Sequence, residues 1–265
     1  MRLIAATTVM ICLSACSPPR ETVTIEFEAR LGDQPIDCET TVDGIAMTDL
    51  RFYVFSPVLF RDDGSEQVLE YVELAENDRW QNRDLVLIDL ENGAGACRNG
   101  TVDTNAIIIG TVPAGDYEGL SLRVEVPFEV NHADPLAASP PLDDSTMHWH
   151  WRSGYKFLRA GIETEDDGFW IHVGSAGCEG TVGDISGCRY SNRMVVFLRD
   201  YRLGEKVVFD LSELTHMADL EDSTPTDCSS GPAEESCGPA FMRLGVDFDT
   251  GEALGNGSPW RVAAE

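Results

Sequence analysis

The chain has 265 residues, with 19 lysines and arginines against 46 aspartates and glutamates, so its formal net charge is −27. Nucleic acids and anionic membrane surfaces are excluded as partners, because the chain would repel them and carries no basic cluster that compensates. The length is sufficient for one large all-β domain or two small ones. Such acidity favours solubility and still permits a basic partner, for example a cationic cytochrome.

Residues 1–16 have the pattern of a lipoprotein signal peptide. Arg2 precedes an apolar run over 3–13, and the segment ends in Leu-Ser-Ala-Cys. The run is much shorter than the roughly 20 residues of a membrane-spanning helix. We expect lipid on Cys16 as the only membrane anchor, and Ser17 favours the outer membrane. An ordinary cleaved signal is the alternative. Either kind of signal peptide places the mature chain in the cell envelope, on the outer membrane or facing the periplasm.

Residues 17–265 are predicted to form a single all-β domain, a β-sandwich of the immunoglobulin-like or a related type. Short runs of β-branched and aromatic residues alternate with turn sequences. The expected strands cover 23–27, 50–55, 85–88, 106–109, 119–126, 168–173, 194–198 and 206–211. A short helix is expected over 211–220, with Ser212 as its N-cap. The alternative is an N-terminal sandwich of about 110 residues followed by a separate half rich in histidine and tryptophan.

Histidines and tryptophans gather in the middle of the chain. Four of the five histidines lie at 132, 148, 150 and 172. If the segment around 149 is extended, Met147, Trp149 and Trp151 share one face, and His148 and His150 share the other. Two imidazoles so placed can bind one metal ion. In an oxidising envelope such a site suits copper or zinc, and a nearby methionine favours copper. A solvent-exposed His-x-His without metal is the alternative.

Trp149 and Trp151 also support a different function. Tryptophans two residues apart in a β-protein fill a core or form the floor of a sugar-binding surface. The chain would then be a surface binding module for carbohydrate or protein, with incidental histidines. The sequence contains neither His-Glu-x-x-His nor Gly-x-Ser-x-Gly, so we expect a binding protein and not an enzyme.

Six cysteines remain beyond Cys12 and Cys16. An even number in an oxidising compartment predicts three disulfides. Short loop closures favour Cys178 with Cys188 and Cys228 with Cys237, which leaves Cys38 with Cys97. The alternative is a thiolate metal site, although no Cys-x-x-Cys pair is present. Residues 219–239 are rich in Asp, Glu, Ser, Thr and Pro, which predicts a long surface loop pinned by its cysteines.

A series of motifs, in order along the chain, resembles one known family. These are Leu-Arg-Phe-Tyr-Val-Phe-Ser at 50–56, Val-Pro-Ala-Gly-Asp-Tyr at 112–117, Val-Pro at 126–127 with Asn-His-Ala-Asp-Pro at 131–135, Ser-Pro-Pro-Leu at 139–142, Met-x-Trp-x-Trp-x-x-Gly-Tyr-Lys-Phe at 147–157, and His-Val-Gly-Ser at 172–175 with the cysteines at 178, 188, 228 and 237. The ordered set resembles the MbnP-like copper-binding proteins, also described as metallo-mystery pair proteins with a four-cysteine motif.

The resemblance implies a copper-binding β-sandwich that acquires, stores or delivers copper. It also implies a partner, a di-haem protein of the MauG and cytochrome c peroxidase type, which oxidises one tryptophan to kynurenine. Carried over, His132 and His172 match the family's recurrent histidines, and Trp149 and Trp151 match its tryptophan pair. The sequence leaves open which tryptophan is modified. His148 and His150 are additions of this chain.

Overall fold

The structure of the protein, a computed structural model, describes residues 19–62, 67–75, 79–218, 227–229, 235–255 and 257–263. The expected signal peptide and Cys16 lie outside the described residues. The strands are β1 (Arg20–Leu31), β2 (Gln34–Pro35), β3 (Thr41–Val42), β4 (Ile45–Asp62), β5 (Gln67–Tyr71), β6 (Glu73–Leu74), β7 (Gln81–Asn82), β8 (Leu85–Asp89), β9 (Ile107–Pro113), β10 (Leu120–Val124), β11 (His148–His150), β12 (Gly154–Glu163), β13 (Gly168–Gly174), β14 (Ala176–Thr181), β15 (Asp184–Tyr190), β16 (Met194–Leu198), β17 (Lys206–Asp210), β18 (Asp227–Ser229) and β19 (Trp260–Val262). The helices are α1 (Phe128–Asn131), α2 (Ser212–Ala218) and α3 (Gly238–Arg243), with 3-10 turns at Ser145–Met147 and Glu235–Cys237.

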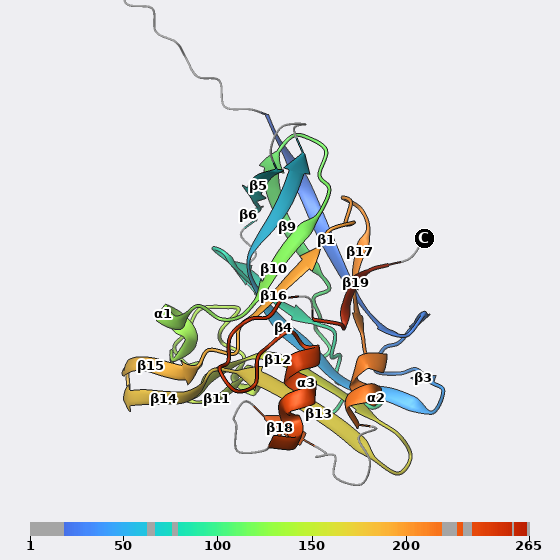
Figure 1. The fold of residues 1–265 in the computed structure, drawn as a ribbon, viewed down its shortest axis with the longest axis vertical. Helices are drawn as coiled ribbons and strands as arrows, with labels where there is room; N and C mark the ends of the chain where they lie inside the picture. Colours follow the sequence, from blue (N-terminus) through green and yellow to red (C-terminus); the bar gives the residue numbers. More distant parts are fainter. Residues whose placement is uncertain are drawn as a thin grey trace, which may run out of the picture.

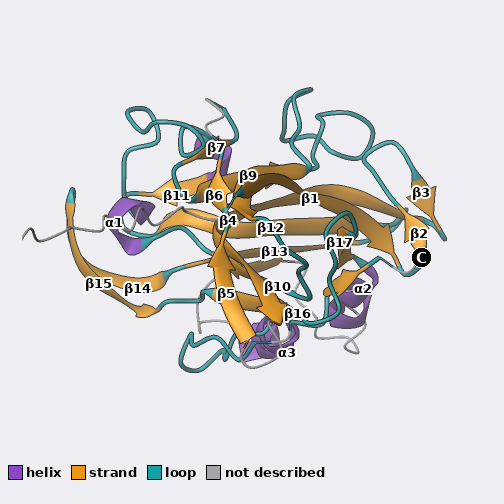
Figure 2. Ribbon diagram, turned by 90° about the horizontal axis from the view of Figure 1, so that it is seen from above, coloured by secondary structure: helices purple, strands orange, loops and turns teal. Residues whose placement is uncertain are grey.

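Most strands belong to two sheets that lie against each other (Figure 1, Figure 2). The smaller sheet has the order β19-β17-β1-β9-β6, with β2 beside β1. The larger sheet has the order β16-β10-β4-β12-β13-β18, and β3, β5, β7, β8 and β11 extend it. β14 and β15 pair with each other as a separate ribbon. The predicted all-β sandwich is confirmed.

The core between the sheets follows from the alternation of apolar residues in β1. Val23, Ile25 and Phe27 are buried, and the residues between them are exposed, as expected for a strand with one face toward a core. Phe27 meets Phe52 of β4 edge to face, with ring centroids 5.5 Å apart, and Trp260 meets Phe52 at 4.9 Å. These aromatic contacts join the two sheets.

β12 is the longest of the strands that the sequence pattern misses, and it lies in the larger sheet between β4 and β13. All of its residues except Glu163 are buried. Lys156 and Arg159 interrupt its apolar pattern, and both are buried here. The strand is covered on both faces, so its residues do not show the alternation of a half-exposed strand.

Two local expectations need correction. Ser212 is the first residue of α2 and not its cap, because its N–H and its hydroxyl both donate to Asp210 Oδ1, at 3.0 and 2.7 Å. The segment 147–151 is extended only at β11, since Met147 ends a 3-10 turn and Trp151 begins a turn. Trp151 therefore does not continue the strand face that was expected to carry it.

The acidic segment 219–239 contains regular structure in the part that the structure describes. β18 pairs in parallel with β13, and α3 follows the second cysteine of the segment. Residues 219–226 and 230–234 lie outside the described residues. No helix of the described chain is long and apolar enough to cross a membrane.

The three predicted disulfides are present. They join Cys38 to Cys97, Cys178 to Cys188 and Cys228 to Cys237, across sequence separations of 59, 10 and 9 residues. The first closes the longest loop, and both of its cysteines are buried. A long closed loop restricts the unfolded chain most, so this bond should contribute most to stability.

Replacing Cys38 and Cys97 by alanine should lower the free energy of unfolding by about 4 kcal/mol. The matched variant, with Cys228 and Cys237 replaced, should lose about 3 kcal/mol because its loop is shorter. Urea unfolding of the oxidised proteins measures both values. A larger loss from the second variant would contradict the loop-length argument.

Candidate metal centre

β11 and the turn after it carry both tryptophans of the predicted site. Met147 is fully buried just before the strand. The turn over 151–153 ends at Gly154, whose φ is 77° and whose α-carbon approaches Asn131 so closely that a Cβ would lie 2.3 Å from its carbonyl oxygen. Glycine is required at this position. The chain then returns in β12, antiparallel to β11.

His148 presents a ring nitrogen without a partner. Its imidazole stands edge-on to the Tyr155 ring, with centroids 4.8 Å apart, because the two residues are opposite each other in the β11–β12 pair. Nε2 is buried, and no described residue forms a hydrogen bond with it. Burial, and then the charge of Lys156, lower the pKa of His148. A neutral imidazole with a buried unpartnered nitrogen is suited to a metal ion.

His150, in contrast, is exposed and bonds to the turn that follows it. Its Nδ1 accepts the Arg152 N–H at 3.2 Å, and its Nε2 lies 3.1 Å from the Ser153 hydroxyl. The pairing register also shifts between His148 and His150. In this conformation the ring of His150 stabilises the turn.

His132 follows α1 and contacts both the turn and the β14–β15 ribbon. Its Nδ1 lies 3.2 Å from the Trp151 carbonyl oxygen, so Nδ1 carries the proton and Nε2 the lone pair. Nε2 lies 3.4 Å from Asn131 Nδ2 and 3.6 Å from Cys188 Sγ. The ring packs edge-on against Phe128 at 5.5 Å. Burial lowers the pKa of His132, and the bond to the Trp151 carbonyl opposes this shift.

His172 lies in β13 on a face of the larger sheet that carries cations. It is opposite Arg159 of β12, which is itself opposite Arg51 of β4. Burial, followed by the charges of Arg159, Lys156 and Arg51, lowers the pKa of His172 to about 3. The imidazole is therefore neutral near pH 7, which is the form that binds a metal.

The ring of Trp149 covers this same face of β13. A Cβ on Gly174 would come within 2.7 Å of the Trp149 ring, and Gly174 lies two residues from His172, on the same side of the strand. The ammonium of Lys156 lies over the indole, 5.7 Å from its centroid. Trp149 is thus packed against the face of β13 that carries His172. The backbone carbonyl of Trp151 faces His132, and Arg152 lies over the Trp151 ring.

Stability should depend on pH through His172. Its pKa is about 3 in the folded chain and about 6.5 in an unfolded one. Between these pH values the unfolded chain binds a proton that the folded chain excludes, so the free energy of unfolding falls toward acid; above about 6.5 both states are neutral and the effect is absent. The free energy of unfolding of the wild-type protein should fall between pH 7.5 and 4.5, and replacing His172 by glutamine should make this fall smaller by up to roughly 2 kcal/mol. Urea unfolding of metal-free wild-type and variant protein tests this, and parallel declines would refute it.

An ion-pair network lies beneath the candidate centre. Asp49 accepts two hydrogen bonds from Arg51, at 2.8 and 2.7 Å, and pairs with Arg159 at 2.8 Å. The carbonyl of Thr146 accepts from Lys156 at 2.7 Å and from Arg159 at 2.9 Å. These bonds fasten the 3-10 turn that precedes β11 to the central strands. The network therefore holds β11 in position.

Sequence reasoning did not assign a site role to these charged residues. One signal in the sequence could have identified them: Arg51 and Arg159 each interrupt an apolar run. A charged residue in a buried central strand must be paired, so such an interruption indicates a buried ion pair. Tyr155 and Asn131 were also missed as supporting residues. Asn131 Oδ1 accepts the Tyr155 N–H at 3.0 Å, which joins α1 to β12.

The predicted ligands fall into two groups. His148 and His150 are in β11, and His132 contacts the turn after β11 through the Trp151 carbonyl. His172 is in β13, which among the described strands pairs with β12 and β18 and not with β11. Among the described residues, ligand atoms of three His, Cys, Asp or Glu side chains lie within 4.8 Å of one another in two groups only, and both contain a disulfide. The ligand roles stay predictions for His132, His148, His150, His172, Trp149 and Trp151.

Comparison with known proteins agrees with this architecture. The family model described as MbnP matches residues 20–230. Among solved structures, MbnP from Methylosinus trichosporium is similar, with a TM-score of 0.76 and 24% sequence identity, over 93% of this chain and 100% of that chain. This likeness shows a shared fold. None of the curated proteins compared with the chain matches it.

Proposed function

The chain belongs to the MbnP family, as the match over residues 20–230 shows, and on this premise we propose that it is a copper-binding protein of the cell envelope. The resemblance inferred from the sequence motifs is confirmed by that match. Copper is the cargo of the protein in acquisition, storage or delivery, and the chain itself catalyses no reaction. The lipid on Cys16 holds it at the membrane.

The observation that carries this proposal is the buried Nε2 of His148, which no described residue engages. An unpartnered buried donor or acceptor costs roughly 1–3 kcal/mol, so an atom of this kind points to a missing ligand. His132 and His172 add two further imidazoles whose pKa values burial lowers. Neutral imidazole nitrogens suit copper. A side-chain rotation is needed to bring these donors to one ion.

We assign the kynurenine to Trp149. The support is its place over Gly174, on the face of β13 that carries His172. Oxidation by a di-haem partner breaks the indole C2–C3 bond with two molecules of hydrogen peroxide, each of which gives one oxygen atom to the tryptophan and leaves the other as water. Hydrolysis of the resulting N-formyl group then consumes one water and releases the C2 carbon as formate. The poorly donating indole nitrogen becomes an aromatic amine that coordinates copper. Trp149 would then supply the ligand that joins the two groups of histidines.

The charge of the chain suits such a partner. A net charge of −27 favours encounter with a basic haem protein and makes the encounter rate fall as the ionic strength rises.

The β14–β15 ribbon and α1 lie side by side at one end of the molecule (Figure 1, Figure 2). His132 links the two through Phe128 and Cys188.

Intact mass and metal analysis of protein purified from its native envelope test the proposal. We expect a lipidated Cys16, a mass change equal to one oxygen gained and one carbon lost, and copper close to one equivalent. Peptide mapping should place the gain at Trp149. The control is the same protein from cells that lack the di-haem partner, which should show neither the mass gain nor tightly bound copper. Unmodified, copper-free protein from wild-type cells would contradict the proposal and favour a metal-free binding module.

A further inference from the structure

We propose that reduction of the Cys178–Cys188 disulfide creates a second metal site, in which both thiolates and His132 bind Cu(I). This inference goes beyond the proposed function, which concerns the oxidised chain. It starts from one group of side chains, because Nε2 of His132 and the sulfur atoms of Cys178 and Cys188 all lie within 4.8 Å of one another.

The distance from the imidazole of His132 to Cys188 is that between two ligands of one metal ion. Nε2 of His132 lies 3.6 Å from Cys188 Sγ. Metal–sulfur and metal–nitrogen bonds of about 2.3 and 2.0 Å place neighbouring ligand atoms about 3.5 to 4 Å apart around one ion. Cys178 and Cys188 are directly opposite each other in the ribbon, with Cα atoms 3.8 Å apart. Their thiols therefore stay on the same face of the ribbon after the disulfide is broken.

The imidazole of His132 is already oriented for this role. Its Nδ1 is held by the Trp151 carbonyl, which leaves the lone pair on Nε2, toward the sulfur atoms. Asn131 supports the same orientation, since its Oδ1 accepts from Tyr155 and its amide nitrogen faces Nε2 at 3.4 Å. Metal-binding histidines are commonly fixed in this way, through the nitrogen that does not bind the metal.

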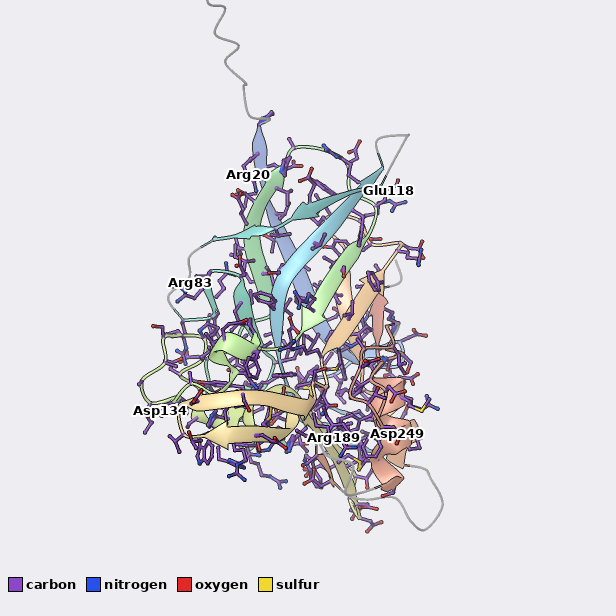
Figure 3. All side chains as sticks on the ribbon, turned by 60° about the vertical axis from the view of Figure 1, so that its left-hand side comes forward. Arg20, Arg83, Glu118, Asp134, Arg189 and Asp249 are labelled. Atoms are coloured by element: carbon purple, nitrogen blue, oxygen red, sulfur yellow. A yellow bond between two sulfur atoms is a disulfide. The ribbon has the colours of Figure 1, made fainter. Side chains whose placement is uncertain are left out.

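The disulfide is placed where a reductant can reach it. β14 and β15 pair only with each other among the described strands, and Cys188 is half-buried. The ribbon lies at an end of the molecule, and Asp134, from the segment after α1, is at the same end (Figure 3). Val182, in the turn that joins the two strands, is 73% exposed. Opening this bond disturbs neither of the two large sheets.

The chemistry uses a dithiol, such as that of an envelope thiol–disulfide oxidoreductase. A thiolate of the reductant attacks one sulfur atom, the Cys178–Cys188 bond breaks, and the second thiol of the reductant closes its own disulfide. Two electrons and two protons pass to the chain, which then carries two thiols. Cu(I) displaces these protons when it binds. Thiolates select Cu(I) and Zn(II) among biological ions.

The test is titration of the full chain with Cu(I) without oxygen, in competition with a coloured Cu(I) chelator, before and after treatment with a dithiol. Alkylation and mass analysis identify which cysteines are reduced. The chain is made without the di-haem partner, so that the proposed copper centre does not compete for His132. We expect the reduced protein to hold close to one Cu(I) per chain more than the oxidised protein, and X-ray absorption to show sulfur ligands at about 2.3 Å. No additional Cu(I) after reduction at Cys178 and Cys188, or no sulfur ligand, would overturn the proposal.

Matched variants separate this site from the proposed copper centre. The double variant Cys178→Ser/Cys188→Ser should lose the gain on reduction. The double variant Cys228→Ser/Cys237→Ser, which lacks a disulfide of similar span, should keep it. Equal gains in the two variants would refute the site. Copper bound by the oxidised wild-type chain tests the proposed function alone, so either proposal can fail without the other.

Discussion

Replacing Asp49 by alanine should lower the free energy of unfolding by roughly 3–5 kcal/mol, because it breaks a buried ion pair and leaves its cations behind. The side chains of Asp49 and Arg51 are 2% and 1% exposed. Asp49 also pairs with Arg159 at 2.8 Å. Two guanidinium groups would lose their shared carboxylate, and Asp144, at 3.8 Å from Arg51, would be a poor substitute.

Urea unfolding at neutral pH measures this loss. The matched control is Asp103→Ala, because Asp103 pairs with Arg79 at 2.6 Å but both side chains are more than half exposed. Such surface pairs contribute about 0–1 kcal/mol. If the two variants lost similar stability, Asp49 would not have the structural role assigned to it. The position of β11 should also change in Asp49→Ala, since the network holds the Thr146 turn beside this strand.

The features predicted correctly from sequence depend on local pattern. The alternation in β1 and the apolar run of β8 mark strands without knowledge of their partners. The pairing of Cys178 with Cys188 follows from a short loop closure, which a hairpin satisfies. These signals are contained in a few neighbouring residues, and for that reason the sequence is sufficient to identify them.

The features that were missed depend on partners distant in sequence. β12 is a central strand because β4 and β13 pair with it on both sides. Its buried cations are tolerated because Arg159 pairs with Asp49 and Lys156 donates to the Thr146 carbonyl. The alternation along 147–151 leaves open whether His148 and His150 bind one ion, and it does not show that His150 Nδ1 accepts the Arg152 N–H of the following turn. Neither result follows from alternation along one segment, since both need the tertiary environment.

The separation of the histidines into two groups gives Trp149 its importance for function. His148 and His150 are in β11 and His132 contacts the turn after it, while His172 is in β13, opposite Arg159. Trp149 is in β11 with His148, and its ring lies over the β13 face of His172. An aromatic amine at this position would be placed between the two groups. Copper affinity should therefore depend on this residue more than on Trp151.

Replacing Trp149 by phenylalanine should weaken copper binding by at least about 100-fold, since removal of a direct ligand exceeds the 10–100-fold effect of losing a supporting residue. The measurement is chelator competition on oxidised protein purified from its native envelope, with the mass gain followed in parallel. Trp151→Phe is the control, and it should keep both the mass gain and most of the affinity. The thermal midpoint should show that Trp149→Phe is folded, because phenylalanine retains an aromatic ring over Gly174. Loss of the mass gain in Trp151→Phe, with Trp149→Phe unaffected, would reverse the assignment and place the aromatic amine beside His132.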